Sequence, residues 1–198
     1  MKIVLIKSFV LPVLSLLASV SFAFSEKTKV DLNKSSGEVE FFATGRPSLL
    51  RIHGKGVAPQ GSFTVQNNRV SGEGTFDLTS LDTGIEMRNH HMKEKYLEVA
   101  KFPVATLKII EMILPQKTDS LNWTVEGVPF QGTLNLHGEI KPVSGTAKVS
   151  LHESKLDLSC EFAVRLKDFG ISVPNYAGIT IGDEIKIHVA DSSAVTIK

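Results

Sequence analysis

The sequence offers few residues whose type and spacing suggest chemistry, and the histidines come first. Of the six histidines, only His90 and His91 are adjacent. Neighbouring residues on a helix point about 100° apart, so this pair is poorly placed to hold one metal ion together. A metal site that combines one of them with a distant histidine stays open, because such a site needs several converging ligands. The plainer interpretation is one histidine on a helix surface and one in a structural hydrogen bond.

The motifs of the common enzyme classes are absent from the sequence, which has no G-x-S-x-G, H-E-x-x-H or C-x-x-C. Cys160 is the sole cysteine, so an internal disulfide is excluded. It falls on the apolar side of its segment, whereas a nucleophilic thiol needs exposure and a basic neighbour. We therefore expect a buried, inert Cys160, and we predict no catalytic residue, no bound metal and no cofactor.

Arg88 is the most informative charged residue, because it lies at the edge of an apolar helical stripe. A guanidinium in that place either pairs with a carboxylate of the protein or meets an anionic group of a ligand. A structural ion pair is the commoner role for such an arginine. The sequence leaves both roles open.

These residues must be positioned by an amphipathic helix around residues 85–99. Ile85, Met92, Tyr96 and Val99 are spaced so that they share one side of a helix. Pro103 prevents this helix from continuing. Beyond it the apolar residues alternate with polar ones, which is typical of a strand.

Alternation with the period of β-strands runs through most of the remaining chain, in residues 39–43, 62–65, 70–78, 105–109, 132–136, 143–151, 156–166 and 185–189. Turn residues at 66–69 predict a hairpin. Strict alternation gives each strand one dry and one wet face. Antiparallel strands of that kind close into a barrel or stack as a sandwich. The sequence predicts a mainly β fold, with one helix on an antiparallel barrel, in a single domain over residues 24–198.

Residues 1–23 are set apart from this domain. Lys2 and Lys7 precede an apolar run, and residues 21–23, Ser-Phe-Ala, supply a cleavage site, which is the layout of a secretory signal peptide. A retained membrane anchor is the competing interpretation, although the run is short and Pro12 interrupts it. The net charge of +1 gives no broad field to steer nucleic acid, so we predict no such partner. We expect export to the periplasm.

Several stretches of the sequence resemble the YceI-like proteins. Residues 87–92 (Met-Arg-Asn-His-His-Met), 96–99 and 101–103 resemble the family's R-D-x-H-L … F-x-D … Y-P signature. Residues 131–143, 167–171 and 181–185 follow the family pattern in the same order. Asn89 and Glu98 stand where aspartate is usual in the family, which puts in doubt any ion pair that depends on residue 89.

The resemblance implies a lipocalin-like, eight-stranded antiparallel barrel that carries a long polyisoprenoid or related lipid in an apolar tunnel without catalysis. The membrane would serve only as the source of the lipid, and a homodimer stays open. By analogy, the tunnel would be lined by inward-facing side chains and two polar residues of the helix: Phe41, Phe76, Leu107, Leu134, Leu136, Val149, Leu158, Phe162, Ile187, Arg88 and His91.

Two functions of other classes stay open beside the carrier. One is an enzyme that acts on an isoprenoid- or quinone-like substrate, with His91 and Arg88 as the first candidates. The other is an interaction protein whose barrel is filled by its own side chains and whose partner surface is an exposed apolar patch.

Overall fold

The computed structural model describes residues 28–32, 36–46, 50–115, 122–152, 155–176 and 179–197. The predicted signal peptide, residues 1–23, lies outside these ranges. The strands are β1 (Thr28–Asp31), β2 (Ser36–Arg46), β3 (Arg51–Val57), β4 (Gln60–Gln66), β5 (Arg69–Asp77), β6 (Val104–Met112), β7 (Asn122–Leu136), β8 (Glu139–His152), β9 (Lys155–Arg165), β10 (Asn175–Tyr176) and β11 (Ile179–Ile197). The helical segments are η2 (Leu78–Ser80), α1 (Glu86–His90), η3 (His91–Tyr96) and η4 (Leu166–Phe169).

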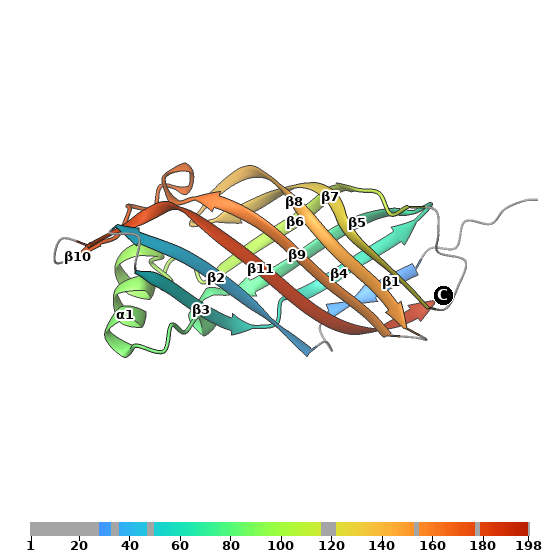
Figure 1. Ribbon diagram of the computed structural model, residues 1–198, viewed down its shortest axis with the longest axis horizontal. Helices are drawn as coiled ribbons and strands as arrows, with labels where there is room; N and C mark the ends of the chain where they lie inside the picture. Colours follow the sequence, from blue (N-terminus) through green and yellow to red (C-terminus); the bar gives the residue numbers. More distant parts are fainter. Residues whose placement is uncertain are drawn as a thin grey trace, which may run out of the picture.

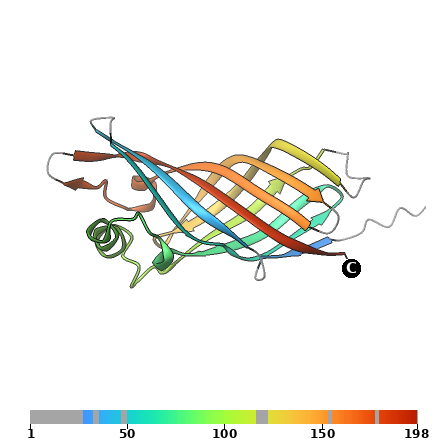
Figure 2. The ribbon, with the colours of Figure 1, turned by 60° about the horizontal axis from the view of Figure 1, so that its bottom comes forward.

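All eleven strands belong to one sheet, which curls into an elongated barrel (Figure 1). Neighbours follow the order β1-β4-β5-β6-β7-β8-β9-β11-β2-β3, and β1 also pairs with the end of β11. Every pairing is antiparallel. β11 runs the whole length of the barrel, as the turned view shows (Figure 2). The predicted mainly β, antiparallel barrel is confirmed.

Two positions around the barrel are each shared by two consecutive strands. β1 and β2 both pair with β11, through residues 195–197 and 180–192 respectively. The other edge of β1 pairs with β4, and the other edge of β2 pairs with β3. Only Ala58 and Pro59 separate β3 from β4, and proline cannot donate to a strand ladder. Ten strands therefore fill the eight predicted positions, and the two-residue β10 adds to the edge of β11.

Tight turns join the strands where the sequence supplies residues that accept a left-handed backbone. Between β4 and β5, Asn67 and Asn68 have φ angles of 51° and 60°. Between β7 and β8, His137 and Gly138 have φ angles of 55° and 80°. Two consecutive left-handed residues make the type I′ turn, whose twist matches that of the flanking strands. The hairpin predicted at residues 66–69 is confirmed.

α1 and η3 form one helical stretch over residues 86–96, shorter than the predicted helix at 85–99. η3 is π-helical, since the Leu97 N–H donates to the carbonyl oxygen of Met92, five residues earlier, at 2.9 Å. Glu98 then adopts a left-handed φ of 45°. This turn ends the helix before Pro103 is reached, so proline is not what ends it. Within the described residues, no helix is long and apolar enough to span a bilayer.

His137 ties the segment after the helix to the end of the barrel. Its Nε2 lies 3.1 Å from Oε2 of Glu98, and its Nδ1 lies 3.2 Å from the carbonyl oxygen of Phe169 in η4. The ring also packs on Phe102, with 4.4 Å between centroids. Both ring nitrogens face oxygen acceptors, and a protonated imidazole can donate to both. The segment after the helix is therefore joined to the β7–β8 turn through His137, which η4 contacts in turn.

Candidate functional site: an apolar cavity

The barrel encloses a cavity of about 560 Å³, a size within the range of about 300–1,000 Å³ that is usual for small-molecule sites. Each of the eight strand positions contributes side chains to its wall, and so do α1 and η3. Most of these side chains are apolar. The interaction-protein alternative required an interior filled by the protein's own side chains. The cavity shows that the interior is not filled.

Ten of the eleven residues predicted to contact a ligand line this cavity: Phe41, Phe76, Leu107, Leu134, Leu136, Leu158, Phe162, Ile187, Arg88 and His91. Val149 is buried, with 3% of its surface exposed, but it is not among the lining residues. The lining part of β7 begins at Phe130 and that of β8 ends at Ala147. Val149 lies two residues further along β8, opposite Leu158 of β9, which does line the cavity. That any of these residues binds a ligand remains a prediction.

The helix contributes more lining residues than its sequence pattern indicated. They come in pairs four residues apart, at 87–88, 91–92 and 95–96. Arg88, His91 and Lys95 have the spacing i, i+3 and i+7, which is one face of a helix. The stripe predicted from the sequence counts apolar residues only, and for that reason it does not include Lys95. Leu50 and Pro174, which lie outside the strands, and Asn175 of the two-residue β10 also line the cavity.

The cavity opens to the surface beside α1. Ile85 and Met87 line it, yet 53% and 66% of their surfaces are exposed. The two adjacent histidines have different surroundings at this opening. His91 lines the cavity, whereas His90 is exposed and its Nδ1 lies 2.8 Å from Oε1 of Glu94. Of the two, only His91 is placed to meet a guest.

A hydrogen-bond network centred on Asn89 fixes the start of α1. Asn89 Oδ1 accepts from the N–H and the hydroxyl of Thr83, at 2.8 and 2.6 Å, while its Nδ2 donates to Asp82 Oδ1 at 2.6 Å. The Gly84 N–H also donates to Asp82, and this bond, followed by that from Asn89, holds the pKa of Asp82 below its usual range. An amide can accept and donate at once, whereas a carboxylate only accepts. Asn89, which stands where the family pattern has aspartate, can therefore donate to Asp82, whereas an ionised aspartate at this position could not.

Arg88 is held by the same turn. Its Nη2 donates to the carbonyl oxygen of Thr83 at 2.6 Å, and its Nε is buried without a hydrogen-bond partner in the described part of the chain. The nearby carboxylates bind other groups: Glu94 pairs with His90, and Glu98 pairs with Lys101 and His137. The ion pairs of the described residues do not include Arg88, so its role is not the structural ion pair that such arginines usually make.

The cavity wall away from the opening is apolar, apart from Asp191 in the second half of β11, of which only 5% is exposed. Cys160 in β9 lines the cavity and is buried, as predicted. Burial raises the pKa of its thiol to about 12. The thiol therefore stays protonated at neutral pH and is a poor nucleophile.

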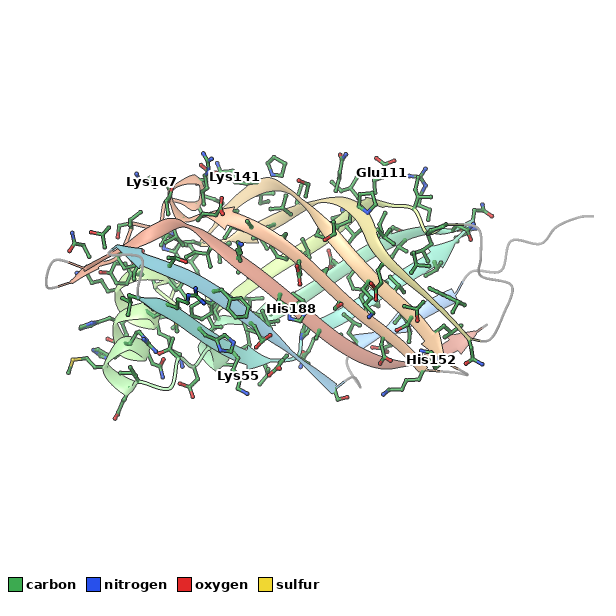
Figure 3. All side chains as sticks on the ribbon, viewed as in Figure 1. Lys55, Glu111, Lys141, His152, Lys167 and His188 are labelled. Carbon is green, nitrogen blue, oxygen red and sulfur yellow. The ribbon has the colours of Figure 1, made fainter. Side chains whose placement is uncertain are left out.

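Polar groups outside the cavity form a separate cluster on β2, β3 and β11. Glu40 lies between His53 and His188, at 2.8 and 3.1 Å, and the bond with His188 is the main cause that holds the pKa of Glu40 below its usual range. Figure 3 shows labelled polar side chains such as Lys141 and Lys167 projecting away from the barrel. Among the described residues, no three histidine, cysteine or acidic side chains are grouped to hold a metal ion.

Comparisons with known proteins agree on the fold. The family described as YceI-like domain matches residues 19–190. BcnA from Burkholderia cenocepacia superposes with a TM-score of 0.64 at 17% identity, covering 82% of this chain and 98% of that chain. A polyisoprenoid-binding domain from Saccharophagus degradans, implicated in plant cell wall breakdown, gives 0.62 at 14% identity over 87% and 99%.

A third solved structure, the YceI protein of Campylobacter jejuni, gives a TM-score of 0.54 at 15% identity over 76% of this chain and 86% of that chain. No curated protein matches the sequence. At these identities the likeness to the solved structures shows a shared fold.

Proposed function

The chain belongs to the YceI-like family, and we propose that it binds and carries a long-chain isoprenoid or a related lipid, without covalent chemistry. The observation that carries this proposal is the apolar cavity of about 560 Å³ that opens beside α1. One solved structure of the same fold is described as polyisoprenoid-binding. That description supports an isoprenoid among the lipids that such a cavity could accept.

The energetics of the apolar wall suit a carrier. Burying hydrocarbon from water yields about 0.8 kcal/mol per CH₂, so a five-carbon isoprene unit yields roughly 4 kcal/mol before the cost of ordering it. A bilayer solvates the same chain about as well, so transfer between membrane and cavity is nearly balanced. Discrimination between lipids then depends on the shape of the cavity and on the polar groups at its opening.

We place this carrier in the periplasm, with the membrane as the source of its lipid and no nucleic-acid partner. Its support is the signal-peptide layout of residues 1–23. N-terminal sequencing of protein recovered from the periplasmic fraction should begin at Phe24. Recovery of the intact N-terminus in the membrane fraction would instead show a retained anchor.

Extraction with organic solvent followed by mass spectrometry tests the carrier directly. Protein purified from its host should release a stoichiometric amount of a lipid, and delipidated protein should take up farnesol. A protein that repeatedly releases no lipid and takes up no added prenyl chain is not a lipid carrier.

A matched pair of variants tests whether the cavity is the place of binding. Gly74 lines the cavity, and a Cβ there would find its nearest atom, Leu32 Cδ1, at an ordinary 3.7 Å. Gly74→Leu should therefore fold and fill part of the cavity, and weaken farnesol binding at least tenfold, since each displaced isoprene unit forfeits roughly 4 kcal/mol. Ser71→Leu adds the same side chain to the exposed face of β5 and should bind as the wild type does.

A further inference from the structure

We propose that the guest carries an anionic head group, a carboxylate or a phosphate, and that Arg88 binds this group at the opening of the cavity. The inference rests on the proposed function and names the class of lipid that the same cavity takes. The apolar tail extends from the opening toward the far end of the barrel.

The first argument is the unsatisfied guanidinium. Arg88 lines the cavity, uses its Nη2 on the carbonyl oxygen of Thr83 at 2.6 Å, and keeps a buried Nε–H without an acceptor in the described chain. Leaving a buried donor of a charged group unpaired is costly. Because the Asn89 network holds Thr83 in place, the guanidinium is fixed in a geometry where an incoming oxyanion can complete its bonds.

The second argument is the balance of charge at the opening. Lys95 also lines the cavity, and its ammonium lies 5.4 Å from the centre of the Tyr96 ring. The carboxylates nearby do not line the cavity: Asp82 accepts from Gly84 and Asn89, Glu94 pairs with His90, and Glu86 is exposed. Two cations therefore line the cavity at its opening, where none of the described carboxylates does.

The third argument is the polarity of the cavity from end to end. β11 runs the length of the barrel (Figure 1), and buried Asp191 lies in its second half, away from the helix. The lining residues of this half include no lysine or arginine, so a head group there would meet no opposite charge. A head group beside Arg88 gains an opposite charge, so an acidic lipid has one favoured orientation.

Binding of farnesyl phosphate and of farnesol to delipidated protein tests the inference, because the two probes share one tail and differ only in the head group. The wild type should bind farnesyl phosphate about tenfold or more tightly than farnesol, as expected for charge-assisted hydrogen bonds. Equal affinities would overturn the head-group assignment and leave the carrier intact. Binding of neither probe would overturn both.

Two variants test whether Arg88 is the source of the preference for farnesyl phosphate over farnesol. Arg88→Met should bring the ratio of the two affinities close to one, whereas Lys108→Met, which removes one cation from the outer face of β6, should keep the wild-type ratio. An unchanged ratio in Arg88→Met would overturn the role of Arg88. If that variant does not fold, Arg88→Lys decides: a point charge cannot reproduce the guanidinium fork, so the ratio should fall, and a full wild-type ratio would overturn the assignment.

Inorganic phosphate serves as the third probe, because it has the head-group chemistry without a tail. It should not displace farnesyl phosphate at concentrations up to a thousandfold above the affinity for the lipid. Displacement at equal concentration would show a site for free phosphate and would overturn the assignment to a lipid head group.

Discussion

The opening of the cavity and its far end are lined by the same barrel and have opposite character. At the opening, Ile85 and Met87 are half or more exposed, and Arg88 and Lys95 bring two positive charges. Toward the far end, Phe130 is 1% exposed and packs edge-on against Phe162, with 6.1 Å between ring centroids.

This difference follows from which segments supply the side chains. Strands deliver alternate residues to the interior, so the far end is as apolar as the pattern of β7 and β9. The opening is lined by helical pairs and loops, and there polar and apolar residues enter together. Specificity for a head group is therefore expected at the helix, whereas stability and affinity for a tail are expected from the strands.

The largest contrast should appear in thiol chemistry. Burial raises the pKa of Cys160 to about 12, compared with about 8.5 for a free thiol, so at pH 8 its thiolate fraction is lower by about three orders of magnitude. Native protein should react with a thiol reagent about a thousandfold more slowly than protein unfolded in urea. Equal rates would show that the far part of the cavity admits water and reagent.

The linked effect on stability has a definite sign. The thiol has a higher pKa in the folded protein than in the unfolded chain, so its contribution to the free energy of unfolding is complete below about pH 8.5 and declines as the pH rises above that value. Cys160→Ala should remove this part of the alkaline pH dependence.

The next largest contrast should be in how much the truncation of a side chain at each end lowers the free energy of unfolding. Phe130→Ala should lower the free energy of unfolding by about 3–5 kcal/mol, because it opens a void in a fully buried part of the wall. Met87→Ala, at a position 66% exposed, should change it by no more than about 0.5 kcal/mol. Urea denaturation measures both, and similar losses would contradict the distinction between the ends.

A charge change in the network at the start of α1 should have a smaller effect. Asn89→Asp places a second carboxylate against Asp82 and should lower Tm by a few degrees at pH 7. One of the two acids then has a raised pKa in the folded state, so the loss should shrink as the pH falls toward about 4.

The exchange of the two residues is the control for this repulsion. Asp82→Asn combined with Asn89→Asp restores one amide and one acid at the same place, and should recover part of the lost Tm. A double variant no more stable than Asn89→Asp would mean that repulsion between the two acids is not the cause.

The smallest effect concerns the contact that anchors the helix. The hydrogen bond from Lys101, and to a lesser degree that from His137, holds the pKa of Glu98 below its usual range. Its stabilisation is therefore present above about pH 4.3 and is lost as the pH falls through the lowered value. Glu98→Gln should flatten the dependence of the urea midpoint on pH between 3 and 5, whereas Glu111→Gln on the outer face of β6 should not.

Most of the strand framework was predictable because each strand carries its own signal. Alternation placed Phe41, Leu134 and Phe162 on the inner face, and the cavity wall includes all three. The same rule selected Val149, which is buried but is not among the lining residues. Alternation identifies the inner face of a strand, and it carries no information about how far along the strand a cavity extends.

The polar part of the site was predictable only in outline. Arg88 and His91 were expected at the cavity, but Lys95, seven residues after Arg88 on the same helical face, was missed because the predicted stripe counts apolar residues only. The fit of Asn89 to Asp82 likewise required knowledge of which two side chains meet.

The sequence by itself determined which side chains point inward, because the period of a strand is a local property of the backbone. Only the tertiary structure decided that eight strand positions close around an unfilled space, and that the Nε of Arg88, beside its opening, is buried without a hydrogen-bond partner among the described residues. Both depend on how segments far apart in the chain meet, and no local pattern contains that information.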